Sequence, residues 1–348
     1  MKIALAFDLR AEYLEMGFSD EETAEFDSED TIRKLSAALE SLGHEVIRVG
    51  NIYELTRRLS LGQTWDLAFN ITEGLYGRSR EAQVPALLEA YNIPYTFSDP
   101  LTLALCLDKA LTKCTVKDAG VPTPEYILIR SVKEIEDYRE KLGSMGYPLF
   151  IKPVSEGTGK GITPASILRD GKELENQAKR LLAKYGQPAL IEKYLSGREF
   201  TVGILGTDER ARVAGVLEVE LLKTAEPLVY SYMNKELCEE RVRYTLVKNK
   251  RIILESSGIA LRAYKALGCR DAGRIDLKMD EGGQLFFLEA NPLAGLNPTH
   301  SDLPILCTQA GMEYKELISR IMESALYRIG NERSRARGRT SITPFSKC

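Results

Sequence analysis

The sequence predicts a mixed fold: an α/β region with a small open parallel sheet at the N-terminus, and antiparallel β-structure later in the chain. Strand-like apolar segments alternate with helical segments up to about residue 100, which is the βαβ order of a parallel sheet. Two pairs of alternating segments then follow, at 199–205 with 213–220 and at 274–279 with 285–291, and each can pair antiparallel. A chain of 348 residues is too long for one ordinary core and indicates two or three domains.

The elements of the N-terminal region follow from hydrophobic spacing. A helix is predicted over 28–42, because its apolar residues recur at helical spacing and Gly43 ends the pattern. The other elements predicted here are strands at 2–7, 44–49 and 66–71 and a helix at 84–91.

The rest of the chain alternates in the same way. A helix over 107–120 is ended by Gly120 and followed by Pro122. The further predicted elements are strands at 126–129, 149–152 and 189–192 and helices at 132–142, 171–185, 252–267 and 313–328. Residues 221–248 are polar, rich in tyrosine and irregular, which indicates a mobile loop over a site.

Composition excludes several classes of function. With 44% hydrophobic and 28% charged residues, the chain has the composition of a soluble globular protein. A net charge of −3 gives no electrostatic attraction to nucleic acid or a membrane surface. There is no signal peptide or long apolar run, and the six cysteines lack CxxC spacing, so we expect a cytoplasmic protein with reduced thiols. The arginine-rich tail from Asn331 is expected to be disordered.

The segment that carries the clearest chemistry is the hairpin over 274–291. If Gly282-Gly283 forms a two-residue turn, Asp276 lies opposite Glu289, and Arg274 lies opposite Asn291. Because side chains alternate along a strand, these four polar residues share one face. The other face would then hold the apolar residues Ile275, Leu277, Met279, Phe286, Leu288 and Ala290, with Met279 opposite Phe286.

Two neighbouring carboxylates and an amide form an oxygen-ligand set that suits Mg²⁺, which completes its shell with water and phosphate oxygens. An arginine beside such a site can hold the negative charge of a phosphate or of a reacting carbonyl. For this segment alone, the alternative interpretation is a solvated outer face with an Arg–Asp ion pair.

A second candidate site is the glycine-rich segment over 150–162, predicted as a strand, a loop and another strand. Gly157, Gly159 and Gly161 leave backbone N–H groups free to approach an anion. Thr158 adds a hydroxyl, and Lys152 and Lys160 add positive charge. The segment lacks the G-x-x-x-x-G-K-[ST] pattern, and a glycine turn without a ligand is the alternative.

A third candidate site is the linker over 193–198, between strands that end at Glu192 and begin near Glu199. A linker between two β-layers offers backbone N–H and C=O groups to a flat heterocycle. The flanking carboxylates could bind an amino group or ribose hydroxyls. A charged surface turn explains this segment equally well.

Together, the three segments resemble the ATP-grasp superfamily and, more narrowly, the D-alanine–D-alanine ligases. The resemblance runs from about residue 69 to about residue 322. It implies an ATP-grasp fold, with an N-terminal domain over 1–105, a central domain over 106–190 and a C-terminal domain over 191–330. ATP would lie between the antiparallel sheets of the last two, and residues 331–348 would form the tail.

The resemblance also implies roles for individual residues. Two Mg²⁺ ions, or Mn²⁺ in their place, would be bound by Asp276, Glu289 and Asn291. ATP would contact Lys109, Lys152, Gly157, Thr158, Gly159, Glu192, Lys193, Leu195, Glu199 and Lys235. Arg274 and Gly295 would stabilise the oxyanion, and His300 with Ser301 would receive the second amino acid.

The function implied is an ATP-dependent carboxylate–amine ligase that forms an amide bond through an acyl phosphate. Its partners would be small amino-acid or peptide-like substrates, with no nucleic acid and no membrane, and a homodimer is left open. Two alternatives are a divergent true D-alanine–D-alanine ligase and a non-catalytic ATP-binding regulatory protein. A Rossmann oxidoreductase is disfavoured, because the glycine fingerprint is absent after the first strand.

The chain departs from the family where the acyl donor should bind. An acidic insertion of about 20 residues follows the first strand, in place of the family's glycine-rich turn. Glu73 stands where the family has a histidine. Glu73, Arg10 and Arg78 are therefore the candidates for contacting the donor.

Overall fold

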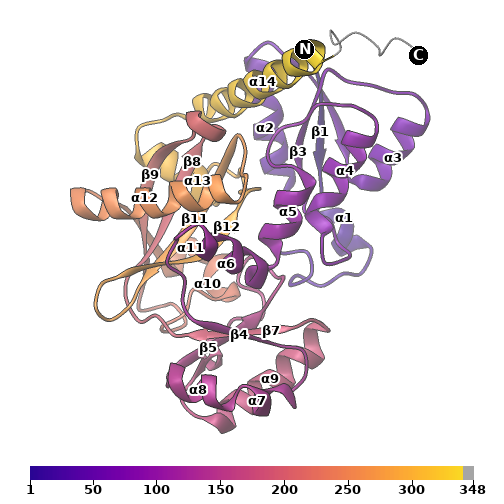
Figure 1. The fold of residues 1–348 in the computed structure, drawn as a ribbon. Coiled ribbons are helices and arrows are strands. Elements are labelled where there is room, and N and C mark those ends of the chain that lie inside the picture. Colours follow the sequence, from indigo (N-terminus) through magenta and orange to yellow (C-terminus); the bar gives the residue numbers. More distant parts are fainter. Residues whose placement is uncertain (340–348) are drawn as a thin grey trace, which may run out of the picture.

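Three β-sheets organise the molecule (Figure 1). The structure is a computed structural model, and it describes residues 1–339. In Figure 1 the N-terminal sheet and its helices lie at the upper right, the small central sheet lies at the bottom, and the C-terminal sheet lies between them on the left.

The N-terminal sheet is parallel and has the order β2-β1-β3, which confirms the predicted open parallel sheet. Its strands are β1 (Lys2–Phe7), β2 (Glu45–Gly50) and β3 (Leu67–Ile71). Around it lie α1 (Arg10–Glu15), α2 (Glu29–Ser41), α3 (Ile52–Ser60), the 3-10 turn η1 (Arg80–Ala82), α4 (Gln83–Ala90) and α5 (Pro100–Leu107). The Ser28 and Asn51 side chains cap α2 and α3. We did not predict α1, α3 and α5.

The central sheet is antiparallel, with the order β4-β7-β5-β6. Its strands are β4 (Tyr126–Ile129), β5 (Leu149–Pro153), β6 (Ile167–Leu168) and β7 (Ala189–Lys193). The helices are α7 (Glu134–Asp137), α8 (Arg139–Met145) and α9 (Gly171–Tyr185), so the single helix predicted over 132–142 is two short ones. The strand predicted directly after the glycine loop comes later, as β6, beyond the 3-10 turn η2 (Pro164–Ser166).

The C-terminal sheet is antiparallel, with the order β10-β9-β8-β11-β12. Its strands are β8 (Glu199–Leu205), β9 (Arg212–Leu221), β10 (Val242–Leu246), β11 (Ala272–Met279) and β12 (Leu285–Asn291), with the 3-10 turn η3 (Asp208–Arg210) between β8 and β9. The long helix α12 (Lys250–Ala266) packs on this sheet, and so does α13 (Asp302–Gln309), which we did not predict. Helix α6 (Lys109–Asp118) packs against β12 and α12.

Two segments have more regular secondary structure than predicted. Residues 221–248, predicted to be irregular, contain α10 (Tyr232–Glu236), α11 (Cys238–Arg241) and β10, which pairs with β9 over five residues. Helix α14 (Tyr314–Arg339) continues through 331–339, where we expected disorder; arginine, glutamate and alanine there are good helix formers. The remainder of that predicted tail, 340–348, lies outside the described residues.

The predicted domain boundaries correspond closely to the sheets, and they remain proposals. Strand β7 ends at Lys193, so the central sheet extends slightly beyond the boundary proposed at residue 190. The chain crosses to the C-terminal sheet over the segment 194–198, between β7 and β8.

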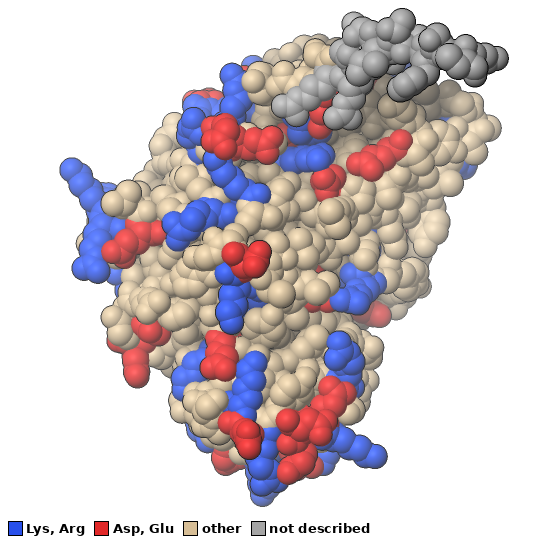
Figure 2. All heavy atoms as spheres, viewed as in Figure 1, with Lys and Arg blue, Asp and Glu red and all other residues tan. Residues whose placement is uncertain are grey.

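Acidic and basic side chains are interspersed on the face drawn in Figure 2, without one large region of a single sign. This agrees with the small net charge of −3. Within the described residues, no helix combines the length and the apolar character that a membrane crossing needs.

Candidate active site

The hairpin of β11 and β12 brings its four predicted polar residues together. Asp276 pairs with Glu289 and Arg274 pairs with Asn291 in the strand register, as predicted. The turn is longer than predicted, because Asp280 bonds to Gln284 across Glu281, Gly282 and Gly283. Met279 therefore pairs with Leu285 and not with Phe286.

A β-bulge in β12 restores the predicted register at the site. The register shifts between Asp276 and Leu277, which leaves Leu288 as the extra residue. As a result Leu285 and Phe287 point into the core, whereas we had predicted Phe286 and Leu288 there. Leu288 instead lines a cavity on the polar face. A pattern of strict alternation cannot reveal a bulge, which explains this error.

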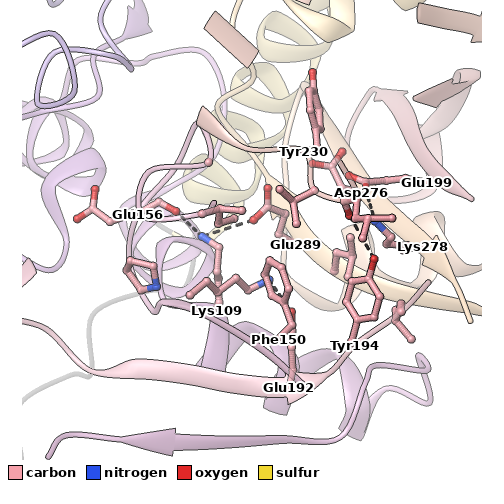
Figure 3. Close-up of a pocket in the computed structure, with 18 of the residues that line it drawn as sticks. Lys109, Phe150, Glu156, Glu192, Tyr194, Glu199, Tyr230, Asp276, Lys278 and Glu289 are labelled. Atoms are coloured by element: carbon pink, nitrogen blue, oxygen red, sulfur yellow. Dashed lines mark hydrogen bonds and ion pairs between the residues drawn. The ribbon is translucent and has the colours of Figure 1, made fainter. Parts of the chain in front are cut away.

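A narrow cavity of about 80 Å³ opens between the central and C-terminal sheets (Figure 3). Phe150 and Tyr194 stack on one side of it, with ring centroids 6.3 Å apart. Most residues predicted to bind ATP line this cavity: Lys109, Lys152, Gly159, Glu192, Lys193, Leu195, Glu199 and Lys235. Gly157 and Thr158 lie on the second cavity instead, on the far side of the same glycine loop.

Lysine–carboxylate pairs surround the first cavity. Lys152 Nζ lies 2.8 Å from one oxygen of Glu192, and the fully buried Lys113 Nζ lies 3.1 Å from the other. The charges of these two lysines overcome burial and hold the pKa of Glu192 below its ordinary value. Each oxygen of Glu192 thus lies within ion-pair distance of a lysine, but Oε2 accepts no hydrogen bond from the described residues, so the contact between Glu192 and a heterocycle amino group stays a prediction.

Lys278 was missed by the sequence analysis. Its Nζ lies 2.7 Å from Glu199 at the wall of the cavity, and Figure 3 shows the pair beside Tyr194 and Asp276. Lys278 stands two residues after Asp276 on β11, so the same period-two argument that selected Arg274 and Asp276 could have found it.

Asp276 accepts hydrogen bonds from three side chains. Its donors are Thr201 Oγ1 at 2.9 Å, Arg274 Nη1 at 2.8 Å and Asn291 Nδ2 at 3.2 Å. Burial and the nearby Glu289 raise the pKa of Asp276 to about 6, although Arg274 opposes this.

Glu289 borders both cavities and lies among positive charges. Lys109 Nζ is 3.5 Å from its Oε2 and also donates a 2.6 Å hydrogen bond to the Glu156 carbonyl (Figure 3). Burial disfavours the ionised form of Glu289, but Lys109 and Lys235 outweigh it and hold its pKa well below the usual range.

The donor set on the hairpin suits Mg²⁺ chemically. It consists of two carboxylates and an amide, and no cluster of three acidic, histidine or cysteine side chains that could enclose a metal occurs in the described residues. A hard cation that keeps water and phosphate oxygens in its shell needs only one or two carboxylates.

A wider cavity of about 480 Å³ meets the first at Glu289 and extends between the C-terminal sheet and the N-terminal domain. It contains most of the predicted catalytic and substrate residues: Arg274, Gly295, His300, Ser301, Glu73 and Arg10. Arg78 lies outside both cavities; it is paired with Asp108 at 2.6 Å, and its side chain is 69% exposed.

The acidic insertion forms part of the second cavity's wall. Glu25 accepts a hydrogen bond from Gly157 N at 2.8 Å and pairs with Lys160 at 3.0 Å and Arg80 at 3.1 Å. Lys160 also pairs with Glu156 at 2.8 Å, so its charge is engaged by carboxylates. No local pattern marked Glu25, because these contacts join segments far apart in the sequence.

Three further carboxylates on this wall, those of Asp27, Glu73 and Glu81, have raised pKa values. Burial is the main cause and neighbouring carboxylates add to it; the pKa of Asp27 and that of Glu81 each reach about 7. This wall therefore carries more carboxyl groups than the sequence predicted.

Comparison with known proteins agrees with this geometry. The family model described as "D-ala D-ala ligase C-terminus" matches residues 115–323, which is more than half of the chain. The chain belongs to the D-alanine–D-alanine ligase family. Members of this family are ATP-dependent carbon–nitrogen ligases, and the chain has their ATP-grasp fold.

Individual family members match over most of their length. The D-alanine–D-alanine ligase of Thermotoga petrophila is 31% identical over 317 residues, covering 91% of this chain and 97% of that one. An uncharacterized protein of Sinorhizobium fredii, y4sG, is 32% identical over 303 residues, covering 83% and 85%. The crystal structure of the Bacillus anthracis D-alanine–D-alanine ligase complexed with ATP has a TM-score of 0.74 at 23% identity, covering 95% and 99%.

Proposed function

We propose that this protein is an ATP-dependent carboxylate–amine ligase that joins amino-acid or peptide-like substrates through an acyl phosphate. The observation that carries the proposal is the position of the hairpin face at the junction of the two cavities. Asp276 and Glu289 border the narrow cavity, and Arg274, Glu289 and Asn291 border the wide one.

ATP is assigned to the narrow cavity. Phe150, Tyr194 and Leu195 offer apolar surface to the base. The Leu195 backbone is assigned to the polar edge of the base, because the Lys193 and Tyr194 N–H groups already donate to the Glu125 and Pro148 carbonyls. Glu199 is assigned to the ribose hydroxyls together with Lys278. Glu192 acts by holding Lys152, which with Lys109 and Lys235 supplies positive charge for the phosphates. The glycine loop is assigned to cover the phosphates, with Gly159 on the narrow cavity and Gly157 and Thr158 on the wide one, where the Gly157 N–H already donates to Glu25.

Asp276, Glu289 and Asn291 would hold Mg²⁺, with Mn²⁺ as a substitute. Bound there, the ion neutralises charge on the transferring phosphoryl group. Lys109 and Lys235 keep Glu289 ionised and thus ready as a ligand.

The donor carboxylate attacks the γ-phosphoryl group of ATP to give an acyl phosphate and ADP. An amine then attacks the acyl carbon and displaces phosphate. Arg274 and the Gly295 backbone stabilise the oxyanion that develops in this second step. His300 and Ser301 are assigned to the acceptor. The segment 221–248 excludes water, because an exposed acyl phosphate would be hydrolysed.

The donor side decides the identity of the substrate. Glu73 and Arg10, which both line the wide cavity, are assigned to the donor, and Arg78 is withdrawn because it lines neither cavity. A true D-alanine–D-alanine ligase is the second candidate, favoured by the relative that is 31% identical across 91% of this chain.

ADP release tests the proposal. The wild-type protein is incubated with Mg²⁺ and ATP and with D- and L-amino acids and dipeptides, singly and in pairs, and the amide products are identified by mass spectrometry. We expect ADP and an amide in matching amounts with at least one pair. D-alanine as the best donor and acceptor would select the second candidate. ATP binding without ADP release from any pair would identify a non-catalytic binder instead.

A further inference from the structure

Arg274 is held by two carboxylates, one of which the sequence analysis did not select. Its Nη1 lies 2.8 Å from Asp276 Oδ2 and 2.9 Å from Asp302 Oδ2. All three side chains are nearly buried, with 13% of Arg274 and 11% of Asp302 exposed. Asp302 is the first residue of α13 and directly follows His300 and Ser301 on the wall of the wide cavity.

Under the proposed function, Asp276 would also bind a cation, whereas Asp302 would bind only Arg274. Asp276 already accepts bonds from Thr201, Arg274 and Asn291, and a cation would need at least one of the same oxygens. A cation bound there repels the guanidinium and competes for its acceptor. If Asp276 were the only partner of Arg274, binding of the ion would leave a nearly buried arginine without a counter-charge, which is costly.

We propose that Asp302 is a positioning residue that holds Arg274 at the reaction centre while Asp276 binds the cation. This inference rests on the proposed function. Asp302 supplies the counter-charge that Asp276 gives up, so the guanidinium keeps its place beside the wide cavity and the cation gains free access to Asp276.

Two tyrosines connect Asp302 to the segment over the nucleotide cavity. Burial and the nearby Asp302 carboxylate raise the pKa of Tyr244, whose hydroxyl lies 2.5 Å from the Tyr230 hydroxyl. Tyr230 borders both cavities, and its backbone packs against Gly159 of the glycine loop so closely that a Cβ on Gly159 would lie 3.3 Å from the Tyr230 carbonyl oxygen. Asp302 is thus electrostatically coupled, through Tyr244 and Tyr230, to the segment that borders the nucleotide cavity.

Cation binding tests the inference without any need for the true substrates. The probe is Mn²⁺, titrated in the presence of the non-hydrolysable analogue adenylyl imidodiphosphate, with free Mn²⁺ measured by electron paramagnetic resonance. Asp302→Asn keeps the size of the side chain but removes its charge, so Arg274 would turn fully to Asp276. We expect the Mn²⁺ dissociation constant to rise about tenfold.

The conservative variant separates charge from packing. Asp302→Glu keeps the carboxylate, and we expect it to bind Mn²⁺ within about threefold of wild type. A purely structural role predicts the opposite order, with Asn tolerated and Glu not. Thermal unfolding of both variants shows whether they fold, and Glu313→Gln, an equivalent change at an exposed residue, is the control.

A double-mutant cycle decides whether Asp302 acts through Arg274. In an Arg274→Ala background no guanidinium competes for Asp276, and Asp302→Asn should then weaken Mn²⁺ binding by less than about threefold. An equal loss in both backgrounds would mean that Asp302 acts on the cation directly and would overturn the inference. Unchanged Mn²⁺ binding by Asp302→Asn would also overturn it. No binding of Mn²⁺ with the analogue by the wild type would overturn the proposed function and this inference together.

Discussion

The two cavities meet at Glu289 but differ in how their charges are matched. Around the narrow cavity, carboxylates are paired with lysines, as in Glu192 with Lys152 at 2.8 Å and Glu199 with Lys278 at 2.7 Å. On the wall of the wide cavity, no hydrogen bond or ion pair from the described residues reaches the carboxylates of Asp27, Glu73 and Glu81. Glu192 and Glu199 therefore have their counter-charges without a ligand, whereas the charge on the wall of the wide cavity changes with pH.

Glu289, the proposed metal ligand that lines both cavities, should give the largest effect when it is changed. Glu289→Gln removes a metal ligand but keeps the shape of the side chain, so we expect ADP release to fall by about 10³ or more while the protein still folds. ADP release is measured with the substrate pair that is most active in the wild-type screen, and thermal unfolding serves as the control. Activity near that of the wild type would disprove the metal assignment.

Arg274 lines the wide cavity, so its loss should affect amide formation and leave ATP binding unchanged. Arg274→Ala should lower amide formation by about 10²–10³, because an oxyanion donor is lost. ATP affinity, measured by calorimetric titration, should stay close to that of the wild type. A comparable loss of ATP affinity would show that the arginine serves the nucleotide side instead.

The unmatched carboxylates of the wide cavity should make stability depend on pH. Folding raises the pKa of Glu81 from 4.5 to about 7, mainly through burial, with Glu25 adding to the rise and Arg80, Lys109 and Lys160 opposing it. Because the folded state binds this proton more tightly, its contribution to stability is complete below pH 4.5 and is lost as pH rises to about 7.

Glu81→Gln should therefore stabilise the protein at pH 8, by at most about 3 kcal/mol, and should have little effect near pH 4. Urea denaturation of the variant and wild type across this pH range measures the difference. The exposed Glu313→Gln should give a flat difference. Destabilisation by Glu81→Gln at pH 8 would contradict the assignment of an unmatched carboxylate.

The smallest effect is expected within the matched pairs of the narrow cavity. Lys278→Met leaves Glu199 without its lysine, and we expect ATP affinity to fall by about fivefold to tenfold. Calorimetric titration with ATP measures this, and Lys179→Met, on the exposed face of α9, is the control. An unchanged affinity would mean that the Lys278–Glu199 pair lies beyond the reach of the nucleotide.

Much of the fold was predictable, because the spacing of hydrophobic residues and the turn-forming residues are signals within short stretches of the sequence. The strands at 126–129 and 199–205 and the helix at 171–185 were predicted with the observed boundaries. Strand β10 was missed because it lies in a polar stretch and owes its form to pairing with β9. Helix α3 was missed although its local signals are clear: Asn51 caps it, and Leu55 and Leu59 stand at helical spacing. Helices α5 and α13 are short, and α5 has no polar face that would mark it.

The sequence by itself determined the hairpin that places Arg274, Asp276, Glu289 and Asn291 on one face, because alternation along a strand is a local property. It also determined the family, through motifs that recur in a fixed order. Only the tertiary structure decided which charged side chains form ion pairs. Three ion pairs join segments that are distant in the sequence: Glu25 with Lys160 of the glycine loop, Lys113 with Glu192, and Asp302 with Arg274. No local pattern encodes such pairs.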